Sequence, residues 1–215
     1  MRPIIAALLT LVMAGSAFAQ GWITYTSRTD SFAVNFPAEP KVQDSTYRTE
    51  YFITLPARVY SSADGASRYS VTVADYTNVE KLHADRMKDC QAALGDVDSC
   101  NPQFQSRTDL RGAILFATWN FFQRDARVSH LTYSYADLVE GNQLQLTNKD
   151  GSRTFAAIYM HENRLYILEG TVPEGAPPPG LFQQSLQFLD QEGNRIRYQS
   201  IYSNGFPPPP HIRYR

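Results

Sequence analysis

Hydrophobic and polar residues alternate along several short segments of the chain, which is the pattern of half-buried β-strands. In residues 32–36 large apolar side chains occupy every second position, and residues 68–76 repeat the pattern. Between them, residues 46–61 are rich in aromatic and β-branched side chains, and Pro56 is expected to bend this ribbon. Together these segments predict an antiparallel meander in the first part of the chain.

A helix is predicted after this meander. Residues 78–94 carry apolar side chains at helical spacing, with Asn78 placed to cap the start and Gly95 placed to end it. His83 and Arg86 fall inside the apolar arc of this helix. Charged or titratable side chains in such a stripe are unusual, so both are candidate contacts for a ligand or partner.

The second half of the chain is richer in strand signals. Residues 113–121 are almost continuously apolar, which predicts a strand buried on both faces. Residues 154–160 and 164–171 predict a hairpin joined at residues 161–163. The remaining expected elements are strands over residues 128–135 and 142–147, an irregular loop over 95–107, a short helix over 181–189 and a turn over 192–194.

Many strands combined with two helices predict an α+β fold class, with an antiparallel β-sheet covered by helices. The chain has 215 residues, which suits one domain together with short terminal segments. We expect this domain to cover residues 20–200 and a Pro-rich C-terminal tail to cover residues 201–215.

The N-terminus has the features of a cleavable signal peptide. Arg2 precedes an apolar run, and Ala17 and Ala19 are the small residues that a signal peptidase accepts before its cut. The apolar stretch is too short to cross about 30 Å of hydrocarbon. We therefore expect removal of residues 1–19, no membrane span in the mature chain, and a periplasmic or secreted location.

Composition and cysteine usage narrow the possible function of the chain and the state of its cysteines. The 20 basic and 21 acidic residues nearly balance, so the chain lacks the basic character of a nucleic-acid-binding protein. Cys90 and Cys100 are the two cysteines, and an even pair this close predicts a structural disulfide in an oxidising compartment. A redox-active pair is the alternative, but the spacing lacks the adjacency of a C-x-x-C motif.

Several short motifs resemble the PsbP-like domain family and its related bacterial secreted proteins. Trp22 is followed by the sequence FAVNFP at residues 32–37 and by Pro40, and the strand 69–76 leads into a helix. Residues 164–170 then lead through prolines into a second helix. The resemblance implies a PsbP-like α/β/α sandwich and an accessory role in binding or assembly. No ligand or metal residue of the photosynthetic members carries over, because no functional motif matches.

The histidines give little support for catalysis or metal binding. His83, His130, His161 and His211 lack the spacing of metal ligands, so we predict no metal, no cofactor and no catalytic residue. The alternative is a periplasmic hydrolase or other enzyme with a site assembled around His130 or His161. Such a site needs a carboxylate and a hydroxyl that converge on the histidine inside a pocket.

The C-terminal tail carries the remaining candidate contacts. Four consecutive prolines favour a polyproline II rod, and Phe206 and Tyr214 could anchor it on a partner. We expect this segment to be a disordered terminus, and docking of the rod on a partner is its functional alternative. The sequence as a whole predicts a non-enzymatic periplasmic accessory module that binds an envelope protein or a small ligand.

Overall fold

The structure is a computed structural model that describes residues 21–95, 100 and 105–214. Its larger sheet has seven strands, and every neighbouring pair is antiparallel. In spatial order these strands are β3 (Lys41–Arg48), β4 (Thr54–Asp64), β5 (Ser67–Asp75), β9 (Arg164–Val172), β8 (Arg153–His161), β7 (Val139–Asn148) and β6 (Ala126–Ala136).

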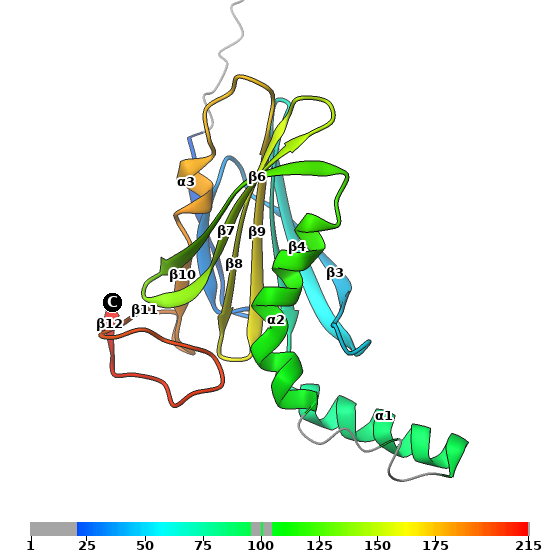
Figure 1. Ribbon diagram of the computed structural model, residues 1–215. Coiled ribbons are helices and arrows are strands. Elements are labelled where there is room, and N and C mark those ends of the chain that lie inside the picture. The colour runs from blue at the N-terminus through cyan, green and yellow to red at the C-terminus, as the bar shows by residue number, and fades with distance from the viewer. Residues whose placement is uncertain (1–20, 96–99, 101–104, 215) are drawn as a thin grey trace, which may run out of the picture.

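A second, five-stranded antiparallel sheet packs on one face of the larger sheet (Figure 1). Helix α2 crosses the opposite face, whereas α3 lies beside the smaller sheet and α1 projects away from the body of the molecule (Figure 1). The strands of the smaller sheet are, in spatial order, β1 (Ile23–Ser27), β2 (Phe32–Phe36), β10 (Gln187–Leu189), β11 (Arg195–Tyr198) and β12 (His211–Tyr214). The helices are α1 (Val79–Leu94), α2 (Gln105–Phe122) and α3 (Gly180–Gln183).

Two hydrophobic cores lie on the two faces of the larger sheet. The core between the sheets is dominated by aromatic rings, including Phe32, Tyr166 and Phe188. The core under α2 is mostly aliphatic, and Ala117 and Ile158 belong to it. Alternate side chains of β8 enter different cores, so this central strand is buried on both faces.

The predicted α+β class, with an antiparallel sheet covered by helices, is confirmed. The helix predicted over residues 78–94 is observed as α1, and Gly95 ends it with a left-handed φ of 66°. The predicted hairpin is observed as β8 and β9, which pair from Arg153 opposite Val172 to His161 opposite Arg164.

The strand predicted over residues 113–121 is wrong, because this segment lies within helix α2. Ala113, Ala117 and Phe121 are buried at a spacing of four, which places them on the side of the helix that faces the sheet. Leu115 and Trp119 are also apolar but point outward, with exposed fractions of 71% and 57%. The apolar run is continuous because both sides of the helix are apolar, and this hid the helical period.

Four smaller predictions also need correction. The helix over residues 181–189 is limited to α3 (Gly180–Gln183), and strand β10 occupies the rest. The bent ribbon over residues 46–61 is two strands, β3 and β4, separated by a turn. Asn78 makes no side-chain capping bond to α1. The end of the predicted loop over 95–107 belongs to α2, which begins at Gln105. Residues 96–99 and 101–104 lie outside the described residues.

The C-terminal tail joins the edge of the smaller sheet. Strand β12 pairs with β11 from Arg195 opposite Tyr214 to Tyr198 opposite His211. Tyr202, which the sequence assigned to the tail, has an exposed fraction of 5% and belongs to the core between the sheets. The tail therefore contributes to the folded body, in contrast to the expectation of a disordered terminus.

The predicted signal peptide lies outside the described residues. Within residues 21–95, 100 and 105–214, no helix has the length and apolar character needed to cross a bilayer.

Candidate functional site

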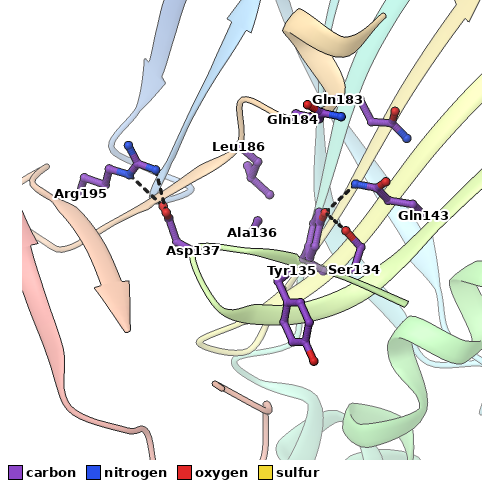
Figure 2. A pocket seen from close by; sticks show the side chains of 10 residues that line it. Ser134, Tyr135, Ala136, Asp137, Gln143, Gln183, Gln184, Leu186 and Arg195 are labelled. Atoms are coloured by element: carbon purple, nitrogen blue, oxygen red, sulfur yellow. Dashed lines mark hydrogen bonds and ion pairs between the residues drawn. The ribbon is translucent and has the colours of Figure 1, made fainter. Parts of the chain in front are cut away.

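A polar cavity of about 370 Å³ lies at one open edge of the space between the two sheets. Its walls come from the end of β6 and the turn after it, from β7 and β8, from α3 and the residues that follow it, and from β11. Most of the side chains that Figure 2 labels point toward a common space, whereas the Tyr135 ring points away from it. The lining residues are Ser134, Tyr135, Ala136, Asp137, Gln143, Tyr159, Gln183, Gln184, Leu186 and Arg195.

Asp137 and Arg195 form a two-point ion pair at one end of the cavity (Figure 2). Arg195 Nε donates to Asp137 Oδ2 at 2.9 Å, and its Nη2 donates to Oδ1 at 2.7 Å. Arg197 Nε also donates to Oδ1, at 3.2 Å. Because the Asp137 side chain is only 4% exposed, these two guanidinium groups compensate a carboxylate that would be costly to bury alone.

The backbone holds this carboxylate in place. Asp137 and Leu138 have positive φ angles of 49° and 66° and form the two-residue connection between β6 and β7. Leu138 is an unusual residue at such an angle, and its carbonyl accepts a hydrogen bond from the Tyr202 amide at 2.9 Å. The Asp137 carbonyl accepts another from the Tyr198 amide at 3.4 Å. The chain around Tyr198–Tyr202 thus stabilises the turn that carries Asp137.

The Tyr159 hydroxyl lies at the centre of a second polar group. Gln143 Nε2 donates to it at 3.3 Å, and the Ser134 hydroxyl lies 3.4 Å away (Figure 2). Gln183 Nε2 donates to the Ala156 carbonyl at 3.0 Å, which directs that amide along the cavity wall.

Gly141 makes room for the Tyr159 ring. A Cβ atom at this position would lie 2.1 Å from the Ile158 carbonyl oxygen and 2.3 Å from Tyr159 Cδ1. Both separations are far below van der Waals contact, so only glycine lets β7 approach β8 this closely. The position of the Tyr159 hydroxyl therefore depends on a glycine two residues before Gln143.

The cavity combines amide and hydroxyl groups with a compensated ion pair. Amides and hydroxyls both donate and accept hydrogen bonds, whereas a charged ligand would need an uncompensated opposite charge. Leu186 and Ala136 add a small apolar surface. This chemistry suits a small neutral molecule that carries several hydroxyl or amide groups.

His161 lies inside the core and does not line the cavity. Its exposed fraction is 0%, and its ring lies 4.4 Å from the Phe188 ring and 5.0 Å from the Tyr202 ring. Nε2 is 2.8 Å from the Tyr198 hydroxyl, and Nδ1 has no hydrogen-bond partner among the described residues. Burial, reinforced by the positive charge of Arg164, lowers the pKa of His161 to about 3, so the imidazole is neutral at physiological pH.

His130 lies on β6 and is exposed to solvent. Among the described residues, no carboxylate makes a hydrogen bond with His130 or His161, and neither histidine lines the cavity. The convergence that the enzymatic alternative requires is therefore absent from the described part of the chain. The same part of the chain holds no group of three or more His, Cys, Asp or Glu side chains arranged to bind a metal ion.

His83 and Arg86 make contacts within the molecule. His83 Nε2 is 2.9 Å from Asp109 Oδ2, and the same oxygen accepts a hydrogen bond from the Thr49 hydroxyl at 2.7 Å. Arg86 donates to the Tyr51 carbonyl. These contacts join α1 and α2 to the turn between β3 and β4. The arrangement is not a catalytic triad, because His83 and the Thr49 hydroxyl each contact the carboxylate and do not contact each other.

The other predicted residues lie apart from the cavity. A disulfide joins Cys90 of α1 to Cys100, as the spacing predicted. Phe206 is 54% exposed, and the Arg111 guanidinium lies 4.8 Å from the centre of its ring. Tyr214 lies on β12, opposite Arg195 of β11 in the backbone register.

Sequence reasoning missed the residues of the cavity. Gln143 is far in the chain from the adjacent Gln183 and Gln184, and a glutamine by itself carries no signal of a site. Asp137 was recognisable only as a turn residue between two strands. The glutamines come together only because β7 and the α3 segment belong to different layers.

Comparison with known proteins supplies little further information. No family model matches the sequence, and no curated protein matches it. The structure is similar to the solution structure of cyanobacterial PsbP (CyanoP) from Synechocystis sp. PCC 6803, with a TM-score of 0.38 and 12% sequence identity. The match covers 74% of this chain and 85% of that chain. At this level of similarity, membership of the PsbP-like family stays a prediction.

Proposed function

We propose that this protein is a non-enzymatic, extracytoplasmic binding module that holds a small, neutral, hydroxyl- or amide-rich ligand in the polar cavity. A saccharide unit that carries an acetamido group is an example of this chemical class. The observation that carries the proposal is a hollow of about 370 Å³ lined by amides, hydroxyls and a compensated ion pair. This volume lies at the lower end of the range for small-molecule sites.

The surroundings of the histidines support binding over catalysis. A general base must reach the proton that it removes. His161 is enclosed by aromatic rings, and its low pKa makes it a weak base. His130 lies on an exposed strand without a carboxylate partner in the described part of the chain.

The extracytoplasmic location is supported by two features. The first nineteen residues have the composition of a signal peptide, and the disulfide between Cys90 and Cys100 suits an oxidising compartment.

Binding of a protein partner is a separate part of the proposal. Arg86 and Phe206 are exposed, so their surfaces are accessible to a partner. His83 would act indirectly, because its side chain is only 9% exposed and contacts Asp109. Tyr214 completes this set of proposed contacts. His83, Arg86 and Phe206 do not line the cavity.

Ligand binding is tested with N-acetylglucosamine as a probe that carries both hydroxyl and amide groups. Nuclear magnetic resonance of the ¹⁵N-labelled mature protein should show shifts at the side-chain amides of Gln143, Gln183 and Gln184. The variant Gln143→Leu should weaken binding by about fivefold, because one good hydrogen bond contributes about 1 kcal/mol. Mass spectrometry of the recovered probe should show that it is unchanged, as a binding module requires.

Gln145→Leu is the matched control. Gln145 lies two residues along β7, on the same face, and outside the cavity. Binding to this variant should equal that of the wild type. The proposal fails if the probe and related neutral polyols cause no shifts at the cavity, or if both variants weaken binding equally. A hydrolysed probe would instead favour the enzymatic alternative.

A further inference from the structure

The two edges of the seven-stranded sheet differ in how they are protected against pairing. At one edge, β3 carries Lys41, Asp44 and Arg48 and is exposed along most of its length. Charged side chains on an edge strand oppose the addition of another strand. At the other edge, β6 has no Asp, Glu, Lys, Arg, Pro or Gly over residues 128–136. This edge therefore lacks the usual protection.

The outward backbone groups of β6 can be assigned from its hairpin. Ala136 pairs with Val139 across the two-residue turn, so in this type of hairpin they form a hydrogen-bonded pair. Every second residue back from Ala136 also bonds to β7. The residues between them are Leu131, Tyr133 and Tyr135, whose N–H and C=O groups therefore point away from β7. The Thr132 hydroxyl contacts the Tyr133 carbonyl at 3.3 Å, which leaves that oxygen one further lone pair.

The same three residues carry large exposed side chains. Leu131, Tyr133 and Tyr135 are 47%, 54% and 45% exposed, and the two tyrosine rings lie 5.1 Å apart. They share the α2 face of the sheet, because Tyr133 pairs with Asn142, and Asn142 donates to Thr118 of α2 at 3.0 Å. The Tyr133 hydroxyl donates to Glu140 on the same face.

A second group of exposed apolar side chains lies on the outer side of α2, which packs on β7, the neighbour of β6. Leu115, Trp119 and Phe122 are 71%, 57% and 41% exposed. Their spacing of four and three residues places them on one side of the helix, adjacent to the side where Thr118 faces β7. They lie on the same face of the larger sheet as the exposed β6 side chains, and clustered exposed apolar residues are typical of interaction surfaces.

We propose that a second copy of this chain covers this surface, by antiparallel pairing of β6 with β6 about a two-fold axis at Tyr133. This register places Tyr133 opposite its own copy and Leu131 opposite Tyr135 of the other copy. All three positions present outward backbone groups, so each pair exchanges two hydrogen bonds. In this register no two like charges lie opposite each other. Arg127, the charged residue of β6, lies opposite Val139 of the other copy, beyond the end of the paired segment.

A second copy fits better than an isolated extended peptide. A two-fold axis perpendicular to the sheet keeps both copies of α2 on the same face. The outer surfaces of the two α2 helices then border a joint floor made by six side chains from the two β6 strands. A peptide strand would pair with the edge but would bring nothing to cover Trp119.

The oligomeric state tests this proposal. Sedimentation equilibrium of the mature protein should show a dimer, and Tyr133→Lys should raise the dimer dissociation constant by about tenfold or more, since it places two ammonium groups opposite each other. Val42→Lys is the matched control, because Val42 lies on the opposite edge strand and is 49% exposed. This control should remain a dimer. Circular dichroism melting verifies that both variants fold.

A cysteine variant tests the register independently. Tyr133→Cys should form a covalent dimer on mild oxidation, since paired residues of this type have Cα atoms about 5.5 Å apart. Val42→Cys should not. A wild-type monomer at all concentrations, or a dimer that Tyr133→Lys does not weaken, overturns the proposal. Probe binding in the cavity should be the same in the Tyr133→Lys variant, so this result is separate from that of the proposed function.

Discussion

Asp30 is a buried polar residue that makes hydrogen bonds with tyrosines of the aromatic core between the sheets. Asp30 is 4% exposed and connects three elements. Its Oδ1 accepts a hydrogen bond from Arg58 at 2.7 Å, its Oδ2 accepts one from the Tyr60 hydroxyl at 2.5 Å, and its carbonyl accepts one from the Tyr166 hydroxyl at 2.8 Å. Burial, with the hydrogen bond to Asp30, raises the pKa of Tyr60, so this hydroxyl remains a donor.

Asp30→Ala is expected to lower the free energy of unfolding by about 2 kcal/mol, because it removes the carboxylate acceptor of the Tyr60 hydroxyl and the nearer counter-ion of Arg58. Asp30→Asn keeps the shape and one acceptor oxygen, so its loss should be smaller. Urea unfolding of both variants measures the difference. Equal stability of Asp30→Ala and the wild type would contradict this account.

The buried His161 predicts a pH dependence of stability. Its folded-state pKa of about 3 lies below the value of 6.5 for an exposed histidine, so the unfolded chain binds more protons between these values. Stability is thus lost as the pH falls through this window. From pH 7 to pH 5 the loss from this residue is about 2 kcal/mol. Urea unfolding at both pH values measures it.

The same experiment on His161→Gln should show a weaker pH dependence, even if the variant is less stable at pH 7. His130→Gln is the control, because it makes the same substitution at an exposed histidine on β6. Its pH dependence should match that of the wild type. A wild-type slope in His161→Gln would exclude His161 as the source.

At the scale of secondary-structure elements, two glycines have opposite effects on stability. Gly112 lies within α2, where a Cβ atom would meet Glu50 Oε2 at an ordinary contact distance of 3.5 Å. Gly141 lies in β7, where a Cβ atom would collide with the backbone of β8.

Gly112→Ala is expected to raise the free energy of unfolding by about 0.5–1 kcal/mol, because alanine has the higher helix propensity. Gly141→Ala is expected to lower it by about 2–3 kcal/mol, since β7 must separate from β8. Gly141→Ala should also weaken binding of the sugar probe by moving Tyr159, whereas Gly112→Ala should leave binding unchanged. Thermal unfolding and probe titration of the pair measure both effects.

At the scale of the whole molecule, the larger sheet has the aromatic core on one face and the aliphatic core on the other. The smaller sheet supports the aromatic core through β2 and β10, whereas β12 lies at its outer edge. The end of the chain therefore contributes less to the core than Tyr202, which precedes it.

Deletion of residues 206–215 should leave the sandwich folded and lower Tm by less than about 5 °C, because His211 and Ile212 of β12 are exposed. Tyr202→Ala should lower Tm more, since this ring is 5% exposed and stacks 4.8 Å from Tyr198. Calorimetry compares the two proteins. A larger loss from the deletion would show that the tail is integral to the domain.

The disulfide should be complete in protein purified from the periplasm. Cys90 and Cys100 should resist alkylation until a reductant is added, because both sulfur atoms are in the disulfide and neither is a free thiol. Loop entropy gives about 3 kcal/mol for a closed loop of this size. Mass spectrometry after alkylation measures the modified fraction, and labelling of both thiols without reduction would refute the prediction.

Much of the fold was predictable because its strands and helix ends leave local patterns in the sequence. Two-residue alternation indicates β2, β5 and the β8–β9 hairpin, and Gly95 marks the end of α1. The disulfide followed from cysteine count, cysteine spacing and the expected export of the chain. The failure at α2 has a physical cause, since an apolar outer face removes the periodic contrast on which helix prediction depends.

The candidate site required the tertiary structure. Gln143 and Gln183 are 40 residues apart in the numbering and line the same cavity only because α3 packs against the larger sheet. Hydrogen-bonding groups at such separations leave no local pattern. The surroundings of His161 were also undecided, because a histidine at a hairpin end has the same sequence context whether exposed or buried.

The sequence by itself determined the fold class, most strands, the disulfide and the expectation of export, because periodicity, turn residues and spacing are local properties. Only the tertiary structure decided that the apolar run at residues 113–121 is a helix, that His161 is buried and that an amide-lined cavity lies between the layers. These features depend on which surfaces meet, and that is settled by packing between residues far apart in the chain.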